Sequence, residues 1–533
     1  MAKKMIKCIA VLLICTVLLS GCGVINGLLS GRLVPYDQMQ YTRPNMIAFA
    51  AVLDKSCNYA LEGEDIDVLE NAIWDFYDVY DSFYTNLNLA FIAYSRDLTD
   101  IYWEEEYAYC SAQAATADAG LDRLYRSLAK SPLRHILEGE DYFGADYFDS
   151  FEGETVYDEQ FVQMLNREAE LCNQYQVISG EAADSTYYSE EYFTQHGSRM
   201  AEVFLQLVQL RQEMTAYLGY DSYPQLAYDL YHIRDYTPQE ATAYLADVRA
   251  ELVPLYSSIL AEPRQELQYC TESDTFGYVR SMAKNMGGII ADAFSDMSRA
   301  GVYDITISDR KYNTSYETYL SSYYTPYIFF CPTATEYDKL TFAHEFAHFC
   351  ADYASPGGSM LGVDASEVFS QAMEYLSLEY AEEADALLEL KMTDSLCVFV
   401  EQAALASFEH QVYSLRGAEL TVEGIEALYE EIFTAYGLNV EGWDSRDYVC
   451  VPHFYQSPMY IISYVLSNDA ALQIYEMELQ EKGSGLACFE ANLTSAQPYF
   501  LAFLEEAGLD SPFATGRLAQ VRKTLETALK TGS

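Results

Sequence analysis

The chain has 533 residues, which is more than one compact core usually holds, so we expect two or three lobes. Its charge is strongly negative, with 31 lysines and arginines against 81 aspartates and glutamates and a net charge of −50 at pH 7. A surface of this charge repels nucleic acid and anionic lipid headgroups, so we expect no nucleic-acid partner.

The N-terminus predicts an export signal with a lipid anchor. Three lysines precede an apolar run from Cys8 to Leu19 that is too short to span a bilayer as a helix. The run ends in Leu-Ser-Gly-Cys at residues 19–22, which resembles the lipobox of bacterial lipoproteins. That resemblance implies removal of the signal peptide, residues 1–21, and lipid attachment to Cys22; the alternative is a plain secretory signal cut nearby. We therefore expect an extracytoplasmic protein that is lipid-anchored to the bacterial cell membrane rather than spanning it.

The rest of the chain reads as helical regions after a short tether. Residues 22–42 contain glycines and prolines with no sustained period and predict the tether. Beyond it, apolar residues recur every three or four positions, which predicts helices from residue 43 onward. The family resemblance described below divides them into an N-terminal helical region over 43–189 and a catalytic region over 190–533. The acidic and aromatic stretch Gly139–Asp158 breaks this period and predicts a solvated surface loop.

Strand signals are sparse, so the fold class is mainly α. The best two are Tyr303–Ser308 and Pro326–Phe330, which predict a small sheet near residues 300–332. Pro326–Phe330 could offer an exposed edge to an extended peptide, or it could lie inside the sheet; the sequence leaves both open.

The segment after these strands carries two histidines at helical spacing. It predicts a helix from Asp338 to Ala354 that is apolar on two sides and therefore buried. His344 and His348 lie one turn apart on one face, with Glu345 beside them. With only seven histidines in the chain, this H-E-x-x-H pattern is rare by chance. Because burying these groups unpaired would be costly, a divalent cation is the expected partner.

A catalytic zinc needs a third protein ligand, with the fourth position left to water. Metzincin peptidases place a histidine ten residues after the first, but here that residue is Ala354. The next segment, 364–390, predicts one helix with Asp364 as its N-cap. Glu367, near its start, is the best third ligand, and Glu374, two turns later, is placed to orient a zinc-bound imidazole.

These residues carry a family resemblance. The segments FAHEFAHF (342–349) and SEVFSQAMEY (366–375) resemble zinc peptidases related to thimet oligopeptidase and oligoendopeptidase F, which show H-E-F-G-H and a downstream E-x-x-S-Q. The similarity extends to 219–256 and 451–475 and covers about residues 190–500. Ala347 replaces a common glycine, and the spacing from the second histidine to the glutamate is shorter than in thimet oligopeptidase. Aminopeptidase N relatives share that spacing, but their G-x-M-E-N and N-E-G segments are absent.

The resemblance implies a multi-helix, two-lobed peptidase with a deep central channel and the small sheet next to the zinc helix. It implies one zinc per chain, held by His344, His348 and Glu367, and a catalytic region over 190–533. Oligopeptides are the expected substrates, and we expect a monomer.

The mechanism that the resemblance implies uses Glu345 as general base and acid in peptide-bond hydrolysis. A histidine and tyrosines of the segment Pro452–Tyr464 would stabilise the oxyanion, and we assign this role to His453 and Tyr460, with Tyr455 and Tyr464 nearby. Two alternatives remain open. The protein could bind peptides without cleaving them, or it could trim them from one end as a carboxypeptidase does.

Overall fold

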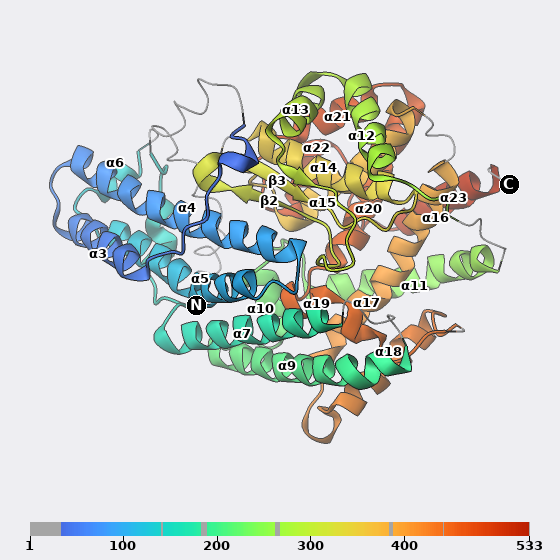
Figure 1. Ribbon diagram of the computed structural model, residues 1–533, viewed down its shortest axis with the longest axis horizontal. Helices are drawn as coiled ribbons and strands as arrows, with labels where there is room; N and C mark the ends of the chain where they lie inside the picture. Colours follow the sequence, from blue (N-terminus) through green and yellow to red (C-terminus); the bar gives the residue numbers. More distant parts are fainter. Residues whose placement is uncertain are drawn as a thin grey trace.

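The computed structural model describes residues 33–139, 142–182, 189–261, 267–355, 357–382, 387–440 and 442–531 (Figure 1). The predicted signal peptide and Cys22 lie outside these ranges. The described residues are mostly helical with one small sheet, as the sequence predicts. No helix among them is both long and apolar enough to cross a membrane.

The first part of the chain consists of helices with a short irregular segment between α6 and α7. They are α3 (Met46–Glu62), α4 (Ile66–Arg96), α5 (Ile101–Ala129), α6 (Arg134–Leu137), α7 (Glu159–Glu181), α8 (Glu190–Tyr192), α9 (Ser198–Leu218), α10 (Tyr223–Leu230) and α11 (Pro238–Leu260).

The second part holds the sheet and the remaining helices. These elements are α12 (Glu272–Met286), α13 (Gly288–Ala300), β1 (Tyr303–Asp304), β2 (Tyr316–Leu320), β3 (Thr325–Phe329), α14 (Asp338–Ala354), α15 (Val363–Tyr380), α16 (Leu388–Cys397), α17 (Ala403–Val412), α18 (Val422–Ala435), α19 (Pro452–Gln456), α20 (Ile462–Gln480), α21 (Ser484–Asn492), α22 (Phe500–Ala507) and α23 (Arg517–Thr531).

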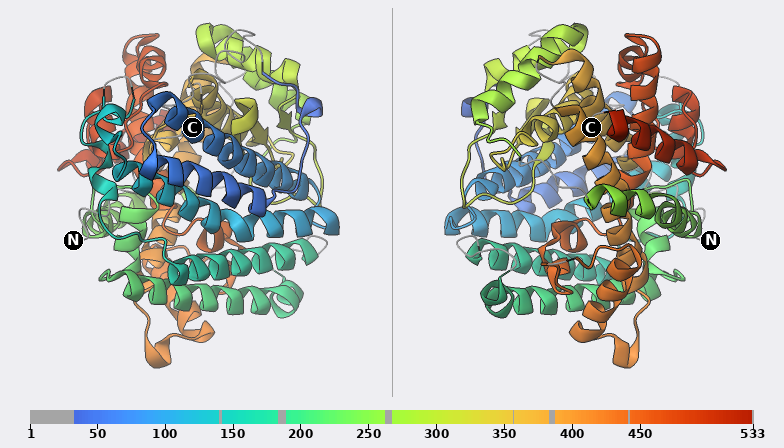
Figure 2. Two further views of the ribbon diagram at one scale, coloured as in Figure 1. Left: turned by 90° about the vertical axis from the view of Figure 1, so that its left-hand side faces the viewer. Right: turned by 90° about the vertical axis from the view of Figure 1, so that its right-hand side faces the viewer.

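Helices α4, α5, α7 and α9 stack one upon the next (Figures 1 and 2). Their starts are fixed by side-chain caps: Asp65, Asp100 and Asp158 each accept a backbone N–H at the first turn of α4, α5 and α7. Such caps satisfy donors that the helix leaves unpaired at its N-terminus.

The segment Gly139–Asp158 was expected to be a solvated loop, and this prediction is wrong for its described residues. Phe143, Phe148 and Phe151 are buried and pack on Tyr125 of α5. The apolar area of the aromatic rings outweighs the acidic residues between them, which face water.

The sheet has the order β1-β3-β2, with β1 parallel and β2 antiparallel to β3. β3 is the central strand and every one of its residues is buried, so the predicted strand Pro326–Phe330 lies inside the sheet rather than at its edge. The predicted strand Tyr303–Ser308 is shorter than expected, because only Tyr303 and Asp304 pair. β2 packs on α4 and on α14, so the sheet lies between these helices.

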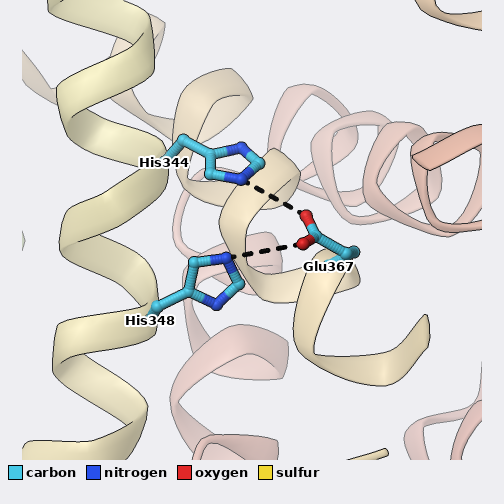
Figure 3. A group of neighbouring side chains, drawn as sticks. All are labelled: His344, His348 and Glu367. Atoms are coloured by element: carbon cyan, nitrogen blue, oxygen red, sulfur yellow. Dashed lines mark ion pairs between the residues drawn. The ribbon is translucent and has the colours of Figure 1, made fainter. Parts of the chain in front are cut away.

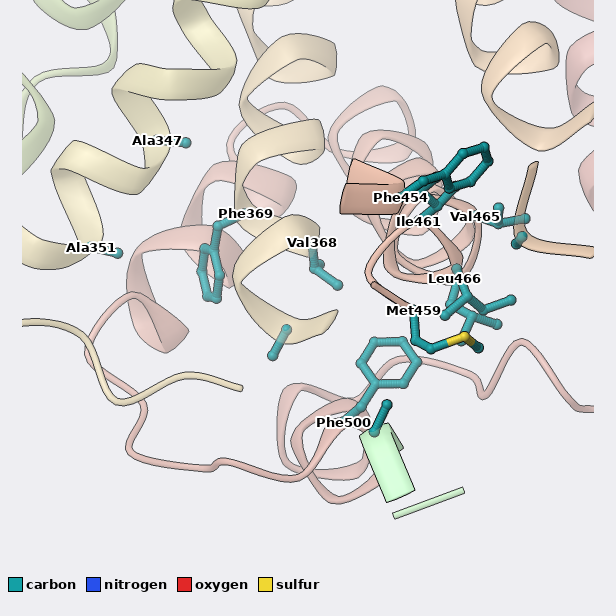
Figure 4. Packing of buried hydrophobic residues seen from close by; sticks show 14 of the residues in the cluster. Ala347, Ala351, Val368, Phe369, Phe454, Met459, Ile461, Val465, Leu466 and Phe500 are labelled. Carbon is teal, nitrogen blue, oxygen red and sulfur yellow. The ribbon is translucent and has the colours of Figure 1, made fainter. Parts of the chain in front are cut away.

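The helix predicted from Asp338 to Ala354 is confirmed as α14. It packs against α15, and α15 packs against α20. Small buried residues such as Ala347 and Ala351 on α14, with Val368 and Phe369 on α15, form this part of the core (Figure 4).

The single helix predicted over 364–390 is wrong. α15 ends at Tyr380, where the Tyr380 carbonyl accepts a hydrogen bond from the Asn285 side chain and Ala381 is extended, and α16 begins at Leu388. Asp364 is not the N-cap, which is Gly362; its carboxylate instead binds other elements, as described below.

Candidate metal centre

Three side chains from α14 and α15 converge with their ligand atoms facing one another (Figure 3). His344 Nε2 lies 3.3 Å from Glu367 Oε2, and His348 Nε2 lies 3.7 Å from Glu367 Oε1. Ligands bound at about 2.0–2.1 Å in tetrahedral geometry are about 3.3 Å apart, which is close to these separations. The two imidazoles and one carboxylate therefore suit a single zinc ion, and no other such cluster exists in the described ranges.

The far side of each imidazole is held by a hydrogen bond. His344 Nδ1 donates to Glu374 Oε1 at 2.8 Å, as the sequence predicts, and His348 Nδ1 pairs with Ser366 Oγ at 3.0 Å. With Nδ1 occupied, Nε2 of each ring is left to face a metal. Sequence reasoning missed Ser366, although it directly precedes the third ligand.

Glu374 is part of a buried chain of charges that the sequence did not predict. Lys391 Nζ on α16 donates to Glu374 Oε2 at 2.7 Å and to Asp394 Oδ2 at 3.1 Å, and the Tyr337 hydroxyl donates to Asp394 at 2.5 Å. Burial opposes the charge of Lys391, but the Glu374 and Asp394 carboxylates hold the lysine pKa above its usual value. The chain keeps Glu374 anionic and in place behind His344.

Glu367 is fixed by two further donors. Ser370 Oγ donates to Glu367 Oε2 at 2.8 Å, and the Tyr460 hydroxyl donates to Glu367 Oε1 at 2.5 Å. Burial alone would raise the pKa of this carboxyl, but His344, His348 and these bonds lower it to about 2. The ligand is therefore ionised at neutral pH, as metal binding requires.

Glu345 lies beside the ligands and is only 6% exposed. Burial and the nearby carboxylates of Glu367 and Glu374 raise its pKa to about 7, against the opposing effect of His344. A carboxyl with a pKa near neutrality can both accept and return a proton.

The three side chains of the centre line one cavity of about 440 Å³, together with Glu345, His453 and Glu317. A second cavity, of about 490 Å³, shares His344, Glu345 and Tyr464 with the first and reaches Lys391 and Glu374.

The predicted oxyanion residues lie on the first of these cavities, but in different settings. His453 Nε2 is 3.1 Å from the Tyr464 hydroxyl, and burial lowers the pKa of His453 to about 4, so it is neutral at pH 7. The Tyr460 ring is 5.7 Å from that of His453, while its hydroxyl binds Glu367. Tyr455 points away: its ring stacks on Tyr175 at 3.7 Å.

Two buried arginines hold the segment that carries these residues. Arg211 donates to the carbonyls of Phe454 and Tyr455 at 2.7 and 2.5 Å. Arg234 donates to the Met459 carbonyl at 2.8 Å and to both Asp364 oxygens at 3.1 and 3.2 Å. Asp364 therefore ties the start of α15 to this segment instead of capping the helix.

Comparisons with known proteins point to one fold. Residues 36–155 match the family model described as the Peptidase M3 N-terminal domain. No curated protein sequence matches the chain. Among solved structures, one assigned as an oligoendopeptidase F superposes with a TM-score of 0.82 at 20% identity, covering 93% of this chain and 99% of that chain.

Two further structures agree. PZ peptidase A, solved with an inhibitor, gives a TM-score of 0.81 at 18% identity, with 93% of this chain and 99% of that chain covered. A structure assigned as an oligoendopeptidase F from Bacillus anthracis strain Ames gives a TM-score of 0.79 at 19% identity. The match covers 94% of this chain and 99% of that chain. The chain therefore has the fold of oligoendopeptidase F, and its first helices resemble the Peptidase M3 N-terminal domain.

Proposed function

We propose that the protein is a zinc-dependent endopeptidase that hydrolyses oligopeptides, with one zinc per chain. The observation that carries the proposal is the convergence of His344, His348 and Glu367 beside Glu345 on a cavity. Zinc bound there would supply a Lewis acid that polarises the peptide carbonyl and makes water more acidic. The relatives of this fold, named as oligoendopeptidase F and PZ peptidase A, support the same reaction class.

Glu345 is the proton carrier in this proposal. It takes a proton from the attacking water and delivers it to the amine that leaves, which its pKa of about 7 favours. Because the carboxyl is buried beside the ligands, bulk water does not compete for the proton.

His453, Tyr460 and Tyr464 are the proposed oxyanion donors, and the Tyr460 hydroxyl would have to turn from Glu367 to the substrate. They line the same cavity as Glu345 and come from one short stretch of chain: His453 lies at the start of α19, Tyr460 between α19 and α20, and Tyr464 in the first turn of α20. Donors fixed in advance are effective because they need no reorganisation when the charge develops.

Two cavities that share His344 and Glu345 leave room for peptide beyond the metal centre, which favours cleavage inside a peptide. A carboxypeptidase would need a group that binds the terminal carboxylate close to the metal, but Lys391 in the second cavity is already paired with two carboxylates. Concave cavities of this size admit unstructured peptides more readily than folded proteins. That the protein is a monomer stays a prediction.

The location outside the cytoplasmic membrane is part of the proposal and rests on the N-terminal sequence. The signal peptide and Cys22 supply the anchor, and the large negative charge keeps the chain soluble beside an anionic membrane.

Replacing Glu345 with glutamine tests the mechanism. We expect Glu345→Gln to retain one zinc, measured by atomic absorption, while kcat on an unstructured peptide falls about 100- to 10,000-fold. Glu389→Gln, which changes an exposed carboxylate on α16, should keep full activity.

Digestion of the same unstructured peptide by the wild type separates an endopeptidase from a carboxypeptidase and from a protein that only binds peptides. Mass spectrometry of the products shows internal cuts for an endopeptidase and stepwise loss of C-terminal residues for a carboxypeptidase. If the zinc-loaded wild type binds the peptide but does not cleave it, the protein is a non-catalytic peptide-binding protein. If Glu345→Gln turns over the peptide as fast as wild type, Glu345 is not the general base.

A further inference from the structure

One acidic side chain on the cavity of about 440 Å³ has no part in the mechanism above. Glu317 lies in the middle of β2, where side chains alternate between the two faces of the sheet. Tyr316 faces α4, because its hydroxyl donates to Ser95 at 3.1 Å. Glu317 faces the other way, toward α14, and lines the cavity with His344 and Glu345.

Glu317 meets a second carboxyl, that of Asp352 on α14, within hydrogen-bonding reach. Asp352 also accepts the backbone N–H of Ser359 at 2.5 Å, whereas Glu317 Oε1 is buried without any N–H or O–H donor in the described chain. Burial, Asp352 and Glu345 raise the pKa of Glu317, and burial raises the pKa of Asp352 to about 6. Each carboxyl therefore disfavours the charged form of its neighbour, and a cation beside them would relieve that repulsion.

No lysine or arginine of the described residues faces Glu317 from this cavity. The cavity is lined by three glutamates, Glu317, Glu345 and Glu367, and by no lysine or arginine. Glu367 faces the two histidines of the metal centre and Glu345 carries the proton, so Glu317 is the acidic group left to act on a ligand. In a partly enclosed site its attraction for a positive charge is stronger than at the surface.

A second metal ion is a poorer occupant than a peptide. Apart from His344, His348 and Glu367, no three ligating side chains converge in the described ranges. Two carboxyls suit one ammonium or guanidinium group, which binds through charge-assisted hydrogen bonds.

We propose that Glu317, which lines the cavity and has Asp352 behind it, forms a subsite for a cationic nitrogen of the peptide, so that substrates with a positive charge close to the cleaved bond are preferred. This rests on the proposed peptidase function. The cation is either a lysine or arginine side chain or the free N-terminal amine of a short peptide, and both offer the same chemistry to the carboxyls.

The test compares matched peptides on the zinc-loaded full chain. A series of unstructured peptides places a single lysine at each position around the cleaved bond in turn, and a matched series has norleucine at the same position. Every peptide is made once with a free N-terminus and once with an acetylated N-terminus. We expect wild type to favour one cationic form by about 10- to 100-fold in kcat/KM, and Glu317→Gln to abolish that preference while cleaving the norleucine peptide as before. Loss of the preference on acetylation identifies the amine; its persistence identifies the side chain.

A charge reversal and a surface control strengthen the test. Glu317→Lys should shift the preference to a glutamate peptide, which a misfolded protein could not do. Asp309→Asn, at an exposed carboxylate shortly before β2, should leave the wild-type preference intact. If the ratio of kcat/KM for the lysine peptide to that for the norleucine peptide is the same in wild type and Glu317→Gln, the proposal is overturned. A second bound zinc in wild type that is absent from Glu317→Gln also overturns it.

Binding separates failure of the subsite from failure of the enzyme. In the Glu345→Gln background, calorimetry measures the affinity for the lysine and norleucine peptides with and without Glu317→Gln. A lysine preference that depends on Glu317 supports the subsite even if wild type cleaves nothing, in which case only the peptidase function fails. Equal affinities in all four combinations overturn the subsite even if wild type is active.

Discussion

At the scale of single residues, the environment decides what each polar side chain can do. Glu345, Glu367 and Glu374 are all buried glutamates near the same histidines, yet their pKa values differ in direction. Burial raises all three. Lys391 and His344 lower the pKa of Glu374, the two histidines lower that of Glu367, and the neighbouring carboxylates raise that of Glu345. In the proposed mechanism, one residue type thus serves as ligand, as support and as proton carrier.

The tyrosines near His453 can be separated by their hydroxyl partners. We expect Tyr460→Phe and Tyr464→Phe each to lower kcat about 100-fold with zinc retained, because both hydroxyls lie on the cavity. Tyr455→Phe should keep kcat and cost about 1 kcal/mol of unfolding free energy, since its hydroxyl only donates to the Met200 carbonyl. Steady-state kinetics and denaturant unfolding measure these effects. An unchanged kcat in both Tyr460→Phe and Tyr464→Phe would remove the tyrosines from the mechanism.

At the scale of elements, the site depends on how α14, α15 and the segment before α20 are held together. Arg234 joins the start of α15 to the Met459 carbonyl, and Arg211 holds the carbonyls at the end of α19. Glu409 of α17 accepts the Met459 N–H at 2.8 Å. Met459 itself has a positive φ of 66°, a conformation that these contacts stabilise.

Glu409 gives this segment a pH dependence. Burial raises its pKa from 4.5 to about 7, against the opposing Met459 N–H and the two arginines. The unfolded chain therefore releases this proton at lower pH than the folded protein does, so Glu409 destabilises the fold progressively as the pH rises from about 4.5 to 7.

Glutamine at this position cannot ionise and still accepts the N–H. Relative to wild type, Glu409→Gln should gain about 1–3 kcal/mol of unfolding free energy between pH 5 and pH 8, measured by denaturant titration. For Glu389→Gln, at an exposed position, the difference in unfolding free energy from wild type should not change with pH. If the difference in unfolding free energy between Glu409→Gln and wild type is also independent of pH, the raised pKa of Glu409 is contradicted.

At the scale of the whole molecule, the stacked helices of the first part and the helices around α15 enclose the sheet and the centre (Figures 1 and 2). The ligands come from two helices that must be packed before they can share an ion, so metal binding should stabilise the folded state. We expect chelation to lower the melting temperature and added zinc to restore it.

The expected gain is about 2.7 kcal/mol when free zinc is 100-fold above its Kd. Differential scanning calorimetry in the presence and absence of zinc measures it. In His348→Ala the zinc-dependent rise should be lost; a rise that persists there would place the ion elsewhere.

The membrane anchor is tested on the complete chain. We expect Cys22→Ser to abolish metabolic labelling by a fatty acid and to move the protein from the membrane fraction to the soluble fraction. The matched variant Cys57→Ser, within α3, should remain labelled. Labelling of Cys22→Ser equal to that of wild type would exclude the lipoprotein assignment.

Features that depend on local spacing could be predicted from the sequence. The 3.6-residue period predicted α14 and placed His344 and His348 on one face, because helix geometry fixes neighbours on a face. Glu367 and Glu374, on the next helix, were predicted from their own spacing and from the family resemblance of their segment, and the structure brings them to the histidines.

Features that depend on contacts between distant segments could not be predicted from the sequence and are seen only in the folded chain. The end of α15 at Tyr380, the burial of the 143–151 aromatics, the place of β3 inside the sheet and the pairing of Lys391 with Glu374 all arise where separate elements meet. The same is true of Glu317 beside Asp352. No sequence period or motif predicts these contacts, because side chains far apart in the sequence become neighbours only when the core packs.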